Sequence, residues 1–137
     1  MNKSGMLSVD TRGRGFTEVT GEVVGWLRGI GAGEGLLTLF IRHTSASLTI
    51  QENADPTVLA DLSDALAAMA PEDRRYRHDT EGPDDMPAHI KAMLTAVHLS
   101  IPVAGGAALL GTWQGIFVIE HRARPHRRQI ALNFIGS

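Results

Sequence analysis

Apolar and polar residues alternate on both sides of a short polar segment near the middle of the chain. The alternation over residues 37–42, and again over 46–51, has the period of two that is typical of strands with one buried face. The parity of the first strand carries His43 onto the apolar face where the strand ends. We therefore expect the imidazole of His43 at the rim of the core, between two strands.

Apolar residues at spacings of three and four predict a helix over residues 56–70, the clearest helix in the chain. Asp55 is its expected N-cap, and Pro56 fits its first position because no backbone N–H is needed there. The stripe expected to face the core consists of Val58, Leu59, Leu62, Leu66 and Met69. The local pattern is equally compatible with a purely structural strand, turn and capped helix.

The remaining elements complete an α+β pattern. Thr20 is expected to cap a helix that runs to about Ile30, and a third helix is expected to begin near Pro87. Two short strands, near 7–10 and 16–19, are expected to pair as an N-terminal hairpin. Later strands are predicted at 101–103, 107–120 and 129–135. The third helix is expected to turn four apolar residues inward, namely Ile90, Met93, Leu94 and Val97.

The C-terminal strands carry apolar residues on both faces around 116–119, as expected for a sheet covered on both sides. A partner subunit can supply one of these covers. The chain has 137 residues and shows no internal repeat or linker, so we expect a single domain over residues 1–137. It is too short for a (β/α)₈ barrel, which typically needs about 250 residues.

Composition excludes several classes of partner. A net charge of −2 and only seven aromatic residues (one Tyr, four Phe, two Trp) argue against nucleic acid, which requires basic surfaces and stacking platforms. No apolar run approaches the roughly 18 residues of a membrane span, and the first residues lack the pattern of a signal peptide. We therefore expect no membrane partner and a cytoplasmic location. The absence of cysteine leaves histidine and carboxylate side chains as the available metal ligands.

Two segments concentrate residues suited to chemistry. The stretch from His43 to Pro56 places an imidazole, hydroxyls, a carboxylate and a carboxamide between a strand and a helix. The long polar connection over 71–86 contains His78 and leads into the third helix. His89 is expected in the first turn of that helix, where the dipole disfavours a protonated ring. A neutral His89 could bind metal or accept a proton; alternatively it only borders the core.

Glu120 is a further candidate because strand parity places it in a largely apolar row. A carboxylate in such a row needs a cation, hydrogen bonds or a proton, which is a common property of site residues. The alternative is that Glu120 simply pairs with an arginine of the basic segment 122–128. That segment could bind phosphate, although such runs more often form a solvated hairpin tip.

Three motifs in order, HTSASLTIQENADP, RHDTEGPDDMPAHIKAML and GTWQGIFVIEHR, resemble the YjbQ-like family of secondary thiamine-phosphate synthases over roughly residues 6–135. The resemblance implies a compact α+β fold, a β-sandwich with helices, that assembles as a homotrimer through its sheets. It also implies a reaction that joins a pyrimidine-methyl diphosphate to a thiazole phosphate and releases pyrophosphate. The expected partner is thus a small phosphorylated metabolite. Two alternatives are a non-catalytic module that binds such a metabolite and a metal-assisted phosphoester hydrolase.

The resemblance also implies roles for individual residues. The expected catalytic residues are His43, His89 and Glu120. The residues expected to bind substrate are Thr44, Ser45, Glu52, Asn53, Asp61 and Gln114. The three histidines His43, His78 and His89 could together hold a divalent metal, zinc or magnesium. The chain departs from the commoner family pattern before His89, where Met-Pro-Ala replaces a frequent Asn-Ala pair, so an amide contact from that position is not expected.

Overall fold

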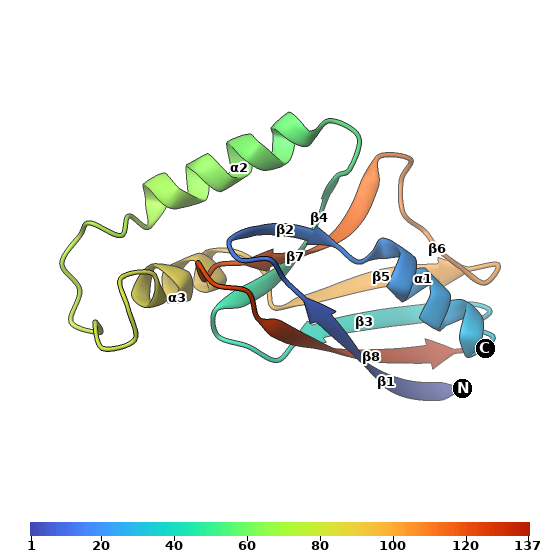
Figure 1. Cartoon of the computed structure of the whole chain (residues 1–137). Coiled ribbons are helices and arrows are strands. Elements are labelled where there is room, and N and C mark those ends of the chain that lie inside the picture. The colour runs from blue at the N-terminus through green and yellow to red at the C-terminus, as the bar shows by residue number, and fades with distance from the viewer.

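Two antiparallel sheets and three helices make up the computed structural model, which describes all 137 residues (Figure 1). The larger sheet has the strand order β1 (Asn2–Asp10), β8 (Arg127–Gly136), β3 (Gly35–Ile41), β5 (His98–Ala104) and β6 (Ala107–Ala108). The smaller sheet has the order β2 (Gly15–Glu18), β7 (Gln114–Glu120) and β4 (Ala46–Glu52). The helices are α1 (Thr20–Gly29), α2 (Pro56–Met69) and α3 (Asp85–Leu94). The α+β class is confirmed.

The inner faces of both sheets share one hydrophobic core, which α1 joins through Val23 and Leu27. The alternation predicted for β3 is confirmed, because Leu37, Leu39 and Ile41 are buried and the residues between them are not. β4 does not alternate: its first three residues are all buried and the other four are half-buried. β7 is buried along most of its length, from Gly115 to the end of the strand, as its apolar faces predicted. The core therefore rests on strands that the hydrophobic pattern identifies locally.

The predicted N-terminal hairpin is wrong. β1 pairs with β8 and β2 pairs with β7, so the turn between β1 and β2 carries the chain from one sheet to the other. Gly13 and Gly15 adopt positive φ angles of 104° and 141° in this connection, a conformation that favours glycine. The crossing brings Thr11 next to the end of β7, which becomes important at the site. The predicted strand over 107–120 is also interrupted, because residues 109–113 form a turn between β6 and β7.

Helix α2 has the predicted start and the predicted cap, and it ends at Met69, one residue before the predicted end. Asp55 Oδ1 accepts a hydrogen bond from the backbone N–H of Thr57 at 2.9 Å. Its apolar stripe, however, has no buried member, and Met69 is 64% exposed. In Figure 1 this helix stands away from the sheets on two extended connections. An apolar face left in this state lacks a cover within the single chain.

Helix α3 begins at Asp85, two residues before the predicted start, and its orientation differs from the prediction. The buried face carries Asp85 and Lys91, with Ala88 and Ala92, whereas Met93 is 79% exposed. Leu94 is exposed as well, so the inward orientation predicted for these two apolar residues is wrong. The orientation of α3 follows from a polar contact: Arg122, which lies just after β7, donates to Asp85 and holds that side of the helix inward.

At the start of α1, Thr20 does not act as a cap. Its hydroxyl donates to Glu18 at 2.8 Å and accepts the backbone N–H of Ile116 at 2.8 Å, which ties the helix start to β7. None of the three helices is both long and apolar enough to cross a bilayer.

Candidate functional site

Four strand ends from both sheets meet at one end of the sandwich. His43 follows β3, Ser45 precedes β4, Glu120 ends β7 and Arg128 lies at the start of β8. The strand register produces this meeting, because Ala46 pairs with Glu120 in the smaller sheet. Residues that are far apart in the sequence therefore share one polar centre.

Glu120 is the most enclosed group of this centre. Its side chain is fully buried and accepts hydrogen bonds from Arg128 Nε at 2.8 Å and from the Thr11 hydroxyl at 2.7 Å. The backbone N–H of Arg122 donates to its other oxygen at 3.1 Å. Burial alone raises the pKa of Glu120, but the hydrogen bonds from Arg128 and Thr11 outweigh it and lower the pKa below its ordinary value. The alternative in which Glu120 pairs with an arginine of the basic segment is thus confirmed.

His43 lies at the rim, as the strand parity predicted. Its Nε2 accepts the backbone N–H of Gln129 at 2.8 Å, and its Nδ1 lies 3.4 Å from Arg128 Nη1, so both ring nitrogens face donors. Burial, followed by the nearby charge of Arg128, lowers the pKa of His43 and favours the neutral ring. A metal could reach Nε2 only after this backbone hydrogen bond is broken.

An open pocket of about 560 Å³ adjoins His43. Its walls include Phe40, Arg42, Thr44 and Arg128. The hydroxyl of Ser45, also in the wall, accepts a hydrogen bond from Arg128 Nη2 at 3.0 Å. Two guanidinium groups and two hydroxyls suit a phosphate group, which needs several donors.

A second group of titratable side chains gathers where α3 begins. His78 Nε2 lies 2.6 Å from Asp85 Oδ2, and His89 Nε2 lies 3.4 Å from the same oxygen. The two imidazole rings meet edge to face with centroids 5.4 Å apart. Asp85 and His89 are one helical turn apart, while the loop before α3 returns His78 to the same point. The candidate ligand atoms of all three residues lie within 4.8 Å of one another.

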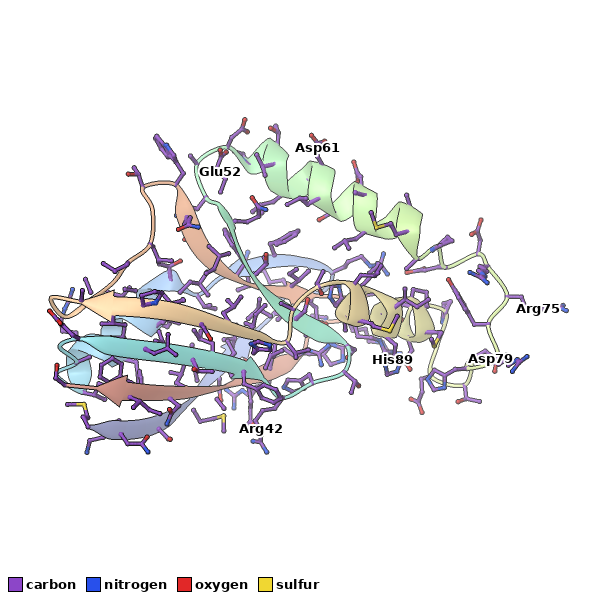
Figure 2. The ribbon with its side chains drawn as sticks, turned by 180° about the vertical axis from the view of Figure 1, so that it is seen from behind. Arg42, Glu52, Asp61, Arg75, Asp79 and His89 are labelled. Carbon is purple, nitrogen blue, oxygen red and sulfur yellow. The ribbon has the colours of Figure 1, made fainter.

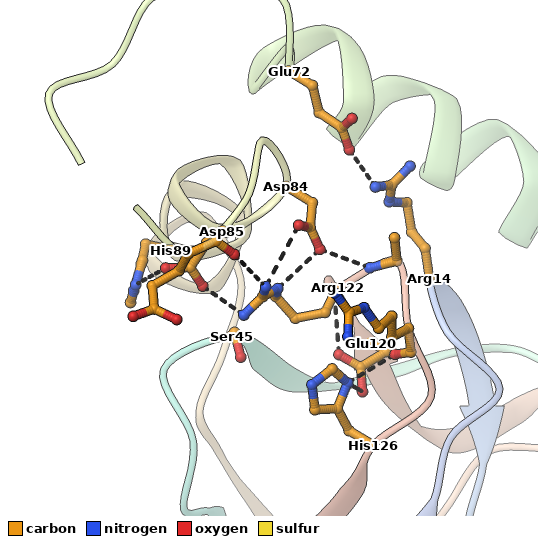
Figure 3. Close-up of polar contacts among 12 residues, drawn as sticks. Arg14, Ser45, Glu72, Asp84, Asp85, His89, Glu120, Arg122 and His126 are labelled. Atoms are coloured by element: carbon orange, nitrogen blue, oxygen red, sulfur yellow. Dashed lines mark hydrogen bonds and ion pairs between the residues drawn. The ribbon is translucent and has the colours of Figure 1, made fainter. Parts of the chain in front are cut away.

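Arg122 orients the carboxylates of this group. Its Nη1 donates to Asp85 Oδ1 at 2.8 Å, and its Nε donates to Asp84 Oδ2 at 2.9 Å (Figure 3). Burial raises the pKa of Asp84, but the bond from Arg122 and the backbone N–H of Ala123 bring it down to about 2. Burial likewise raises the pKa of Asp85, while His78 and Arg122 lower it overall. Both carboxylates are therefore ionised near neutral pH.

Arg122 also links the two groups. Its backbone N–H binds Glu120 and its side chain binds Asp85, so one residue joins the β-strand centre to the histidines on α3. Figure 3 shows both sets of side chains around this arginine. A displacement of Asp85 can thus reach Glu120 through one residue, Arg122.

The donor set of His78, Asp85 and His89 fits a divalent ion of the zinc class. Two ligands of a tetrahedral zinc ion lie ~3.3 Å apart, which matches the separation of His89 from Asp85. The shorter separation of His78 from Asp85 would have to open by less than an ångström, which is ~0.7 Å on the same geometry. Arg122 occupies the other oxygen of Asp85 and fixes the carboxylate, as outer partners of metal ligands usually do.

This set differs from the predicted three histidines. The structure brings His78 and His89 together, but within one chain His43 lies in the separate pocket and the third place belongs to Asp85. The sequence contained a signal for this: an aspartate and a histidine four residues apart share one face of a helix.

Three of the predicted substrate-binding residues, Glu52, Asn53 and Gln114, lie at the other end of the small sheet. Glu52 pairs with Gln114 in the register, six residues from Ala46 and Glu120, or roughly 20 Å at about 3.3 Å per residue. Asn53 donates to Glu18 at 3.1 Å, and Gln114 accepts the backbone N–H of Gly111 at 2.7 Å.

Asp61, also predicted to bind substrate, lies exposed on α2. Figure 2 shows Glu52 and Asp61 on the opposite side of the molecule from Arg42. Within a single chain, none of the four residues reaches His43, namely Glu52, Asn53, Asp61 and Gln114.

The chain matches a known family along nearly its whole length. The UPF0047 protein YjbQ-like profile matches residues 6–137. The chain belongs to the YjbQ-like UPF0047 family. A UPF0047 protein of Synechocystis sp. is 49% identical over 132 residues, which cover 96% of this chain and 90% of that protein. The YjbQ protein of Salmonella typhimurium is 44% identical over 131 residues, covering 95% of each chain.

Solved structures agree with the YjbQ-like fold. A hypothetical protein from Aeropyrum pernix K1 superposes with a TM-score of 0.90 at 28% identity, covering 98% of this chain and 99% of its own. A conserved hypothetical protein from Thermus thermophilus gives a TM-score of 0.85 at 38% identity, covering 96% and 99%. The names of these YjbQ-like relatives give the family and no reaction.

The sequence did not reveal one buried polar cluster of this YjbQ-like chain. His121 is 1% exposed, and its Nε2 lies 2.8 Å from the Ser47 hydroxyl, which in turn accepts from Thr95 at 2.7 Å. Burial, helped by the charge of Lys91, lowers the pKa of His121 to about 4. A strand-end histidine beside a charged residue looks exposed in sequence, but in the folded chain Leu66 of α2 and Lys91 of α3 lie around the same point.

Proposed function

We propose that this protein is a metal-dependent enzyme that acts on a phosphorylated small molecule. The observation that carries the proposal is the convergence of His78, Asp85 and His89, with Asp85 buried and oriented by Arg122. The donor-rich pocket at His43 supports the second half of the proposal, because it offers a phosphate both cations and hydroxyls. This pocket and the histidine set are linked through Glu120 and Arg122.

Each part has a distinct task in this proposal. His78, Asp85 and His89 would hold the ion, which would supply positive charge to stabilise a phosphate leaving group or to lower the pKa of a bound water. Arg128 and Ser45 hold a phosphate of the substrate, and His43, whose Nδ1 lies 3.4 Å from Arg128 Nη1, stands beside that guanidinium in the pocket wall. Glu120 positions Arg128 and does not contact substrate, since its oxygens are taken by protein donors. His43 and His89 thus act at different positions.

The reaction we place first is the joining of a pyrimidine-methyl diphosphate to a thiazole phosphate. The thiazole nitrogen forms a bond to the methylene carbon, the carbon–oxygen bond to the diphosphate breaks, and pyrophosphate leaves. This chemistry requires two anion positions and charge stabilisation of the leaving group. A pocket with two arginines next to a candidate metal centre supplies groups of both kinds.

A second candidate function is metal-assisted hydrolysis of a phosphoester. The specific observation in its favour is the imidazole-rich ligand set, because magnesium, the usual partner of diphosphates, prefers oxygen ligands. A zinc-class ion with three protein ligands retains a position for water, which can act as a nucleophile near neutral pH. A binding module without turnover would saturate with ligand and convert none.

We also propose that the protein assembles as a homotrimer through its larger sheet. The outer face of that sheet exposes Leu36, Phe40 and Ile135, each with 45–60% of its surface accessible. Apolar residues on adjacent strands form a surface that a second copy can cover. Size-exclusion chromatography with light scattering tests this, and Phe40→Glu with Ile135→Glu should shift the mass to one chain. A wild-type protein of monomer mass would contradict it.

Product analysis tests the function. Purified protein loaded with zinc, manganese or magnesium is incubated with the two thiamine precursors and, separately, with simple phosphomonoesters. Release of pyrophosphate that is lost in Asp85→Asn and His89→Ala supports the synthase, whereas release of inorganic phosphate from the esters supports the hydrolase. Saturable binding with no product under any metal would overturn both enzymatic proposals.

A further inference from the structure

The loop between α2 and α3 forms a second pocket, and His78 is one of the residues in its wall. We propose that this pocket is an anion-binding subsite for a phosphate group of the substrate, an inference that rests on the proposed function and adds a specificity element to it. The pocket has a volume of about 310 Å³, and its walls include Glu72, Arg74, Arg75, Tyr76, His78 and Asp79.

The charges of this pocket favour an anion. Neither Arg74 nor Arg75 forms an ion pair, and both line the wall. Of the two carboxylates in the wall, Glu72 is already bound by Arg14, the residue before β2. The other carboxylate, Asp79, lines the wall as well, and Arg75 reaches outward from the loop in Figure 2. Arg74 is exposed, lines the wall and forms no ion pair, so its charge is free to meet an anion.

Arg74 is also held in place before any ligand arrives. Its guanidinium carbon lies 5.6 Å from the centre of the Tyr76 ring. The Tyr76 hydroxyl donates to the backbone oxygen of Pro71 at 2.7 Å, which fixes the ring against the loop. A guanidinium that rests on a ring keeps its N–H groups free at the edge, where a phosphate binds. Less side-chain freedom is lost on binding than for a mobile surface arginine.

The position of the pocket connects it with the candidate metal centre. His78 belongs to both, because its ring lines the pocket and its Nε2 lies within the ligand set. A phosphate in the pocket would thus lie beside the residues proposed to act on the substrate. The loop would select small molecules that carry an anionic group next to the reacting centre, and neutral analogues would bind poorly.

Calorimetric titration with inorganic phosphate and with pyrophosphate, in EDTA and at constant ionic strength, tests the subsite. Arg74→Gln should weaken pyrophosphate binding by about tenfold, the loss expected for a charge-assisted contact. Tyr76→Leu should weaken it as well, because the arginine loses its support. Arg77→Gln is the matched control: it removes the same charge from the same loop, but Arg77 does not line the pocket, so affinity should change less than about twofold.

The outcomes separate this inference from the proposed function. Equal losses in Arg74→Gln and Arg77→Gln, or no binding of either anion to the wild-type protein, would overturn the subsite. Asp85→Asn should retain pyrophosphate binding in EDTA, since the carboxylate is not part of the pocket. If the metal proposal fails, the anion titration still reports on Arg74; if the subsite fails, metal binding at Asp85 is unaffected.

Discussion

Acidification from pH 7 to pH 4 should destabilise this protein chiefly through His121. The pKa of this buried histidine is about 4 in the folded chain, against 6.5 for an ordinary histidine. The unfolded chain therefore takes up the proton first as the pH falls. The stability that neutral His121 contributes is complete above about pH 6.5 and is lost progressively down to about pH 4. A lowering of this size corresponds to about 3 kcal/mol of unfolding free energy.

Urea unfolding at several values between pH 7.5 and 4.5, followed by tryptophan fluorescence, measures this loss. His121→Asn removes the titrating group, so its stability should fall less steeply with acidification than that of the wild type, although the variant starts less stable at pH 7. His98→Asn provides the control, since His98 is exposed on β5 and its replacement should leave the wild-type slope unchanged. Parallel pH profiles for the wild type and His121→Asn would refute the assignment of the pKa shift.

Further predictions concern the packing around the polar centre. Glu120→Gln removes the only carboxylate bound to buried Arg128 and should cost about 3 kcal/mol in urea unfolding. Thr11→Val deletes the hydroxyl between Glu120 and the backbone that leads into β8 and should cost about 2 kcal/mol in the same assay. Gly35→Ala would overlap the backbone of Ile135 and should lower the unfolding free energy by about 2 kcal/mol, whereas Gly21→Ala, in open space on α1, should raise it by about 0.5 kcal/mol.

Local signals predicted the elements whose determinants lie close together in sequence. The Asp55 cap and the following proline defined the start of α2, and strict alternation defined β3 and β4. Strand partners were harder, because β1 and β2 are adjacent in sequence but each finds a longer apolar strand in a different sheet. The glycine-containing turn between β1 and β2 indicated a hairpin, but a turn of this kind can also carry the chain from one sheet to another.

In the candidate site, too, local signals were predictable and long-range contacts were not. His78 and His89 were identified from residue type and position, and they do meet. Their third partner, Asp85, depends on Arg122, which lies 37 residues later and turns the polar face of α3 inward. No periodicity of α3 alone contains that information, because its apolar residues predicted the opposite face. The positions of Glu52 and Gln114 depend on the register of β4 with β7, which a single sequence does not encode locally.

Metal binding by purified protein tests the proposed centre most directly. After removal of metal with chelator, zinc is titrated into the wild type, Asp85→Asn, His89→Ala and His43→Ala, and bound metal is counted after dialysis. The structure predicts one zinc ion per chain, lost in Asp85→Asn and His89→Ala and retained in His43→Ala, whose ring lies in the neighbouring pocket. A wild-type protein that binds no zinc, or loss of zinc in His43→Ala as complete as in Asp85→Asn, would contradict this centre.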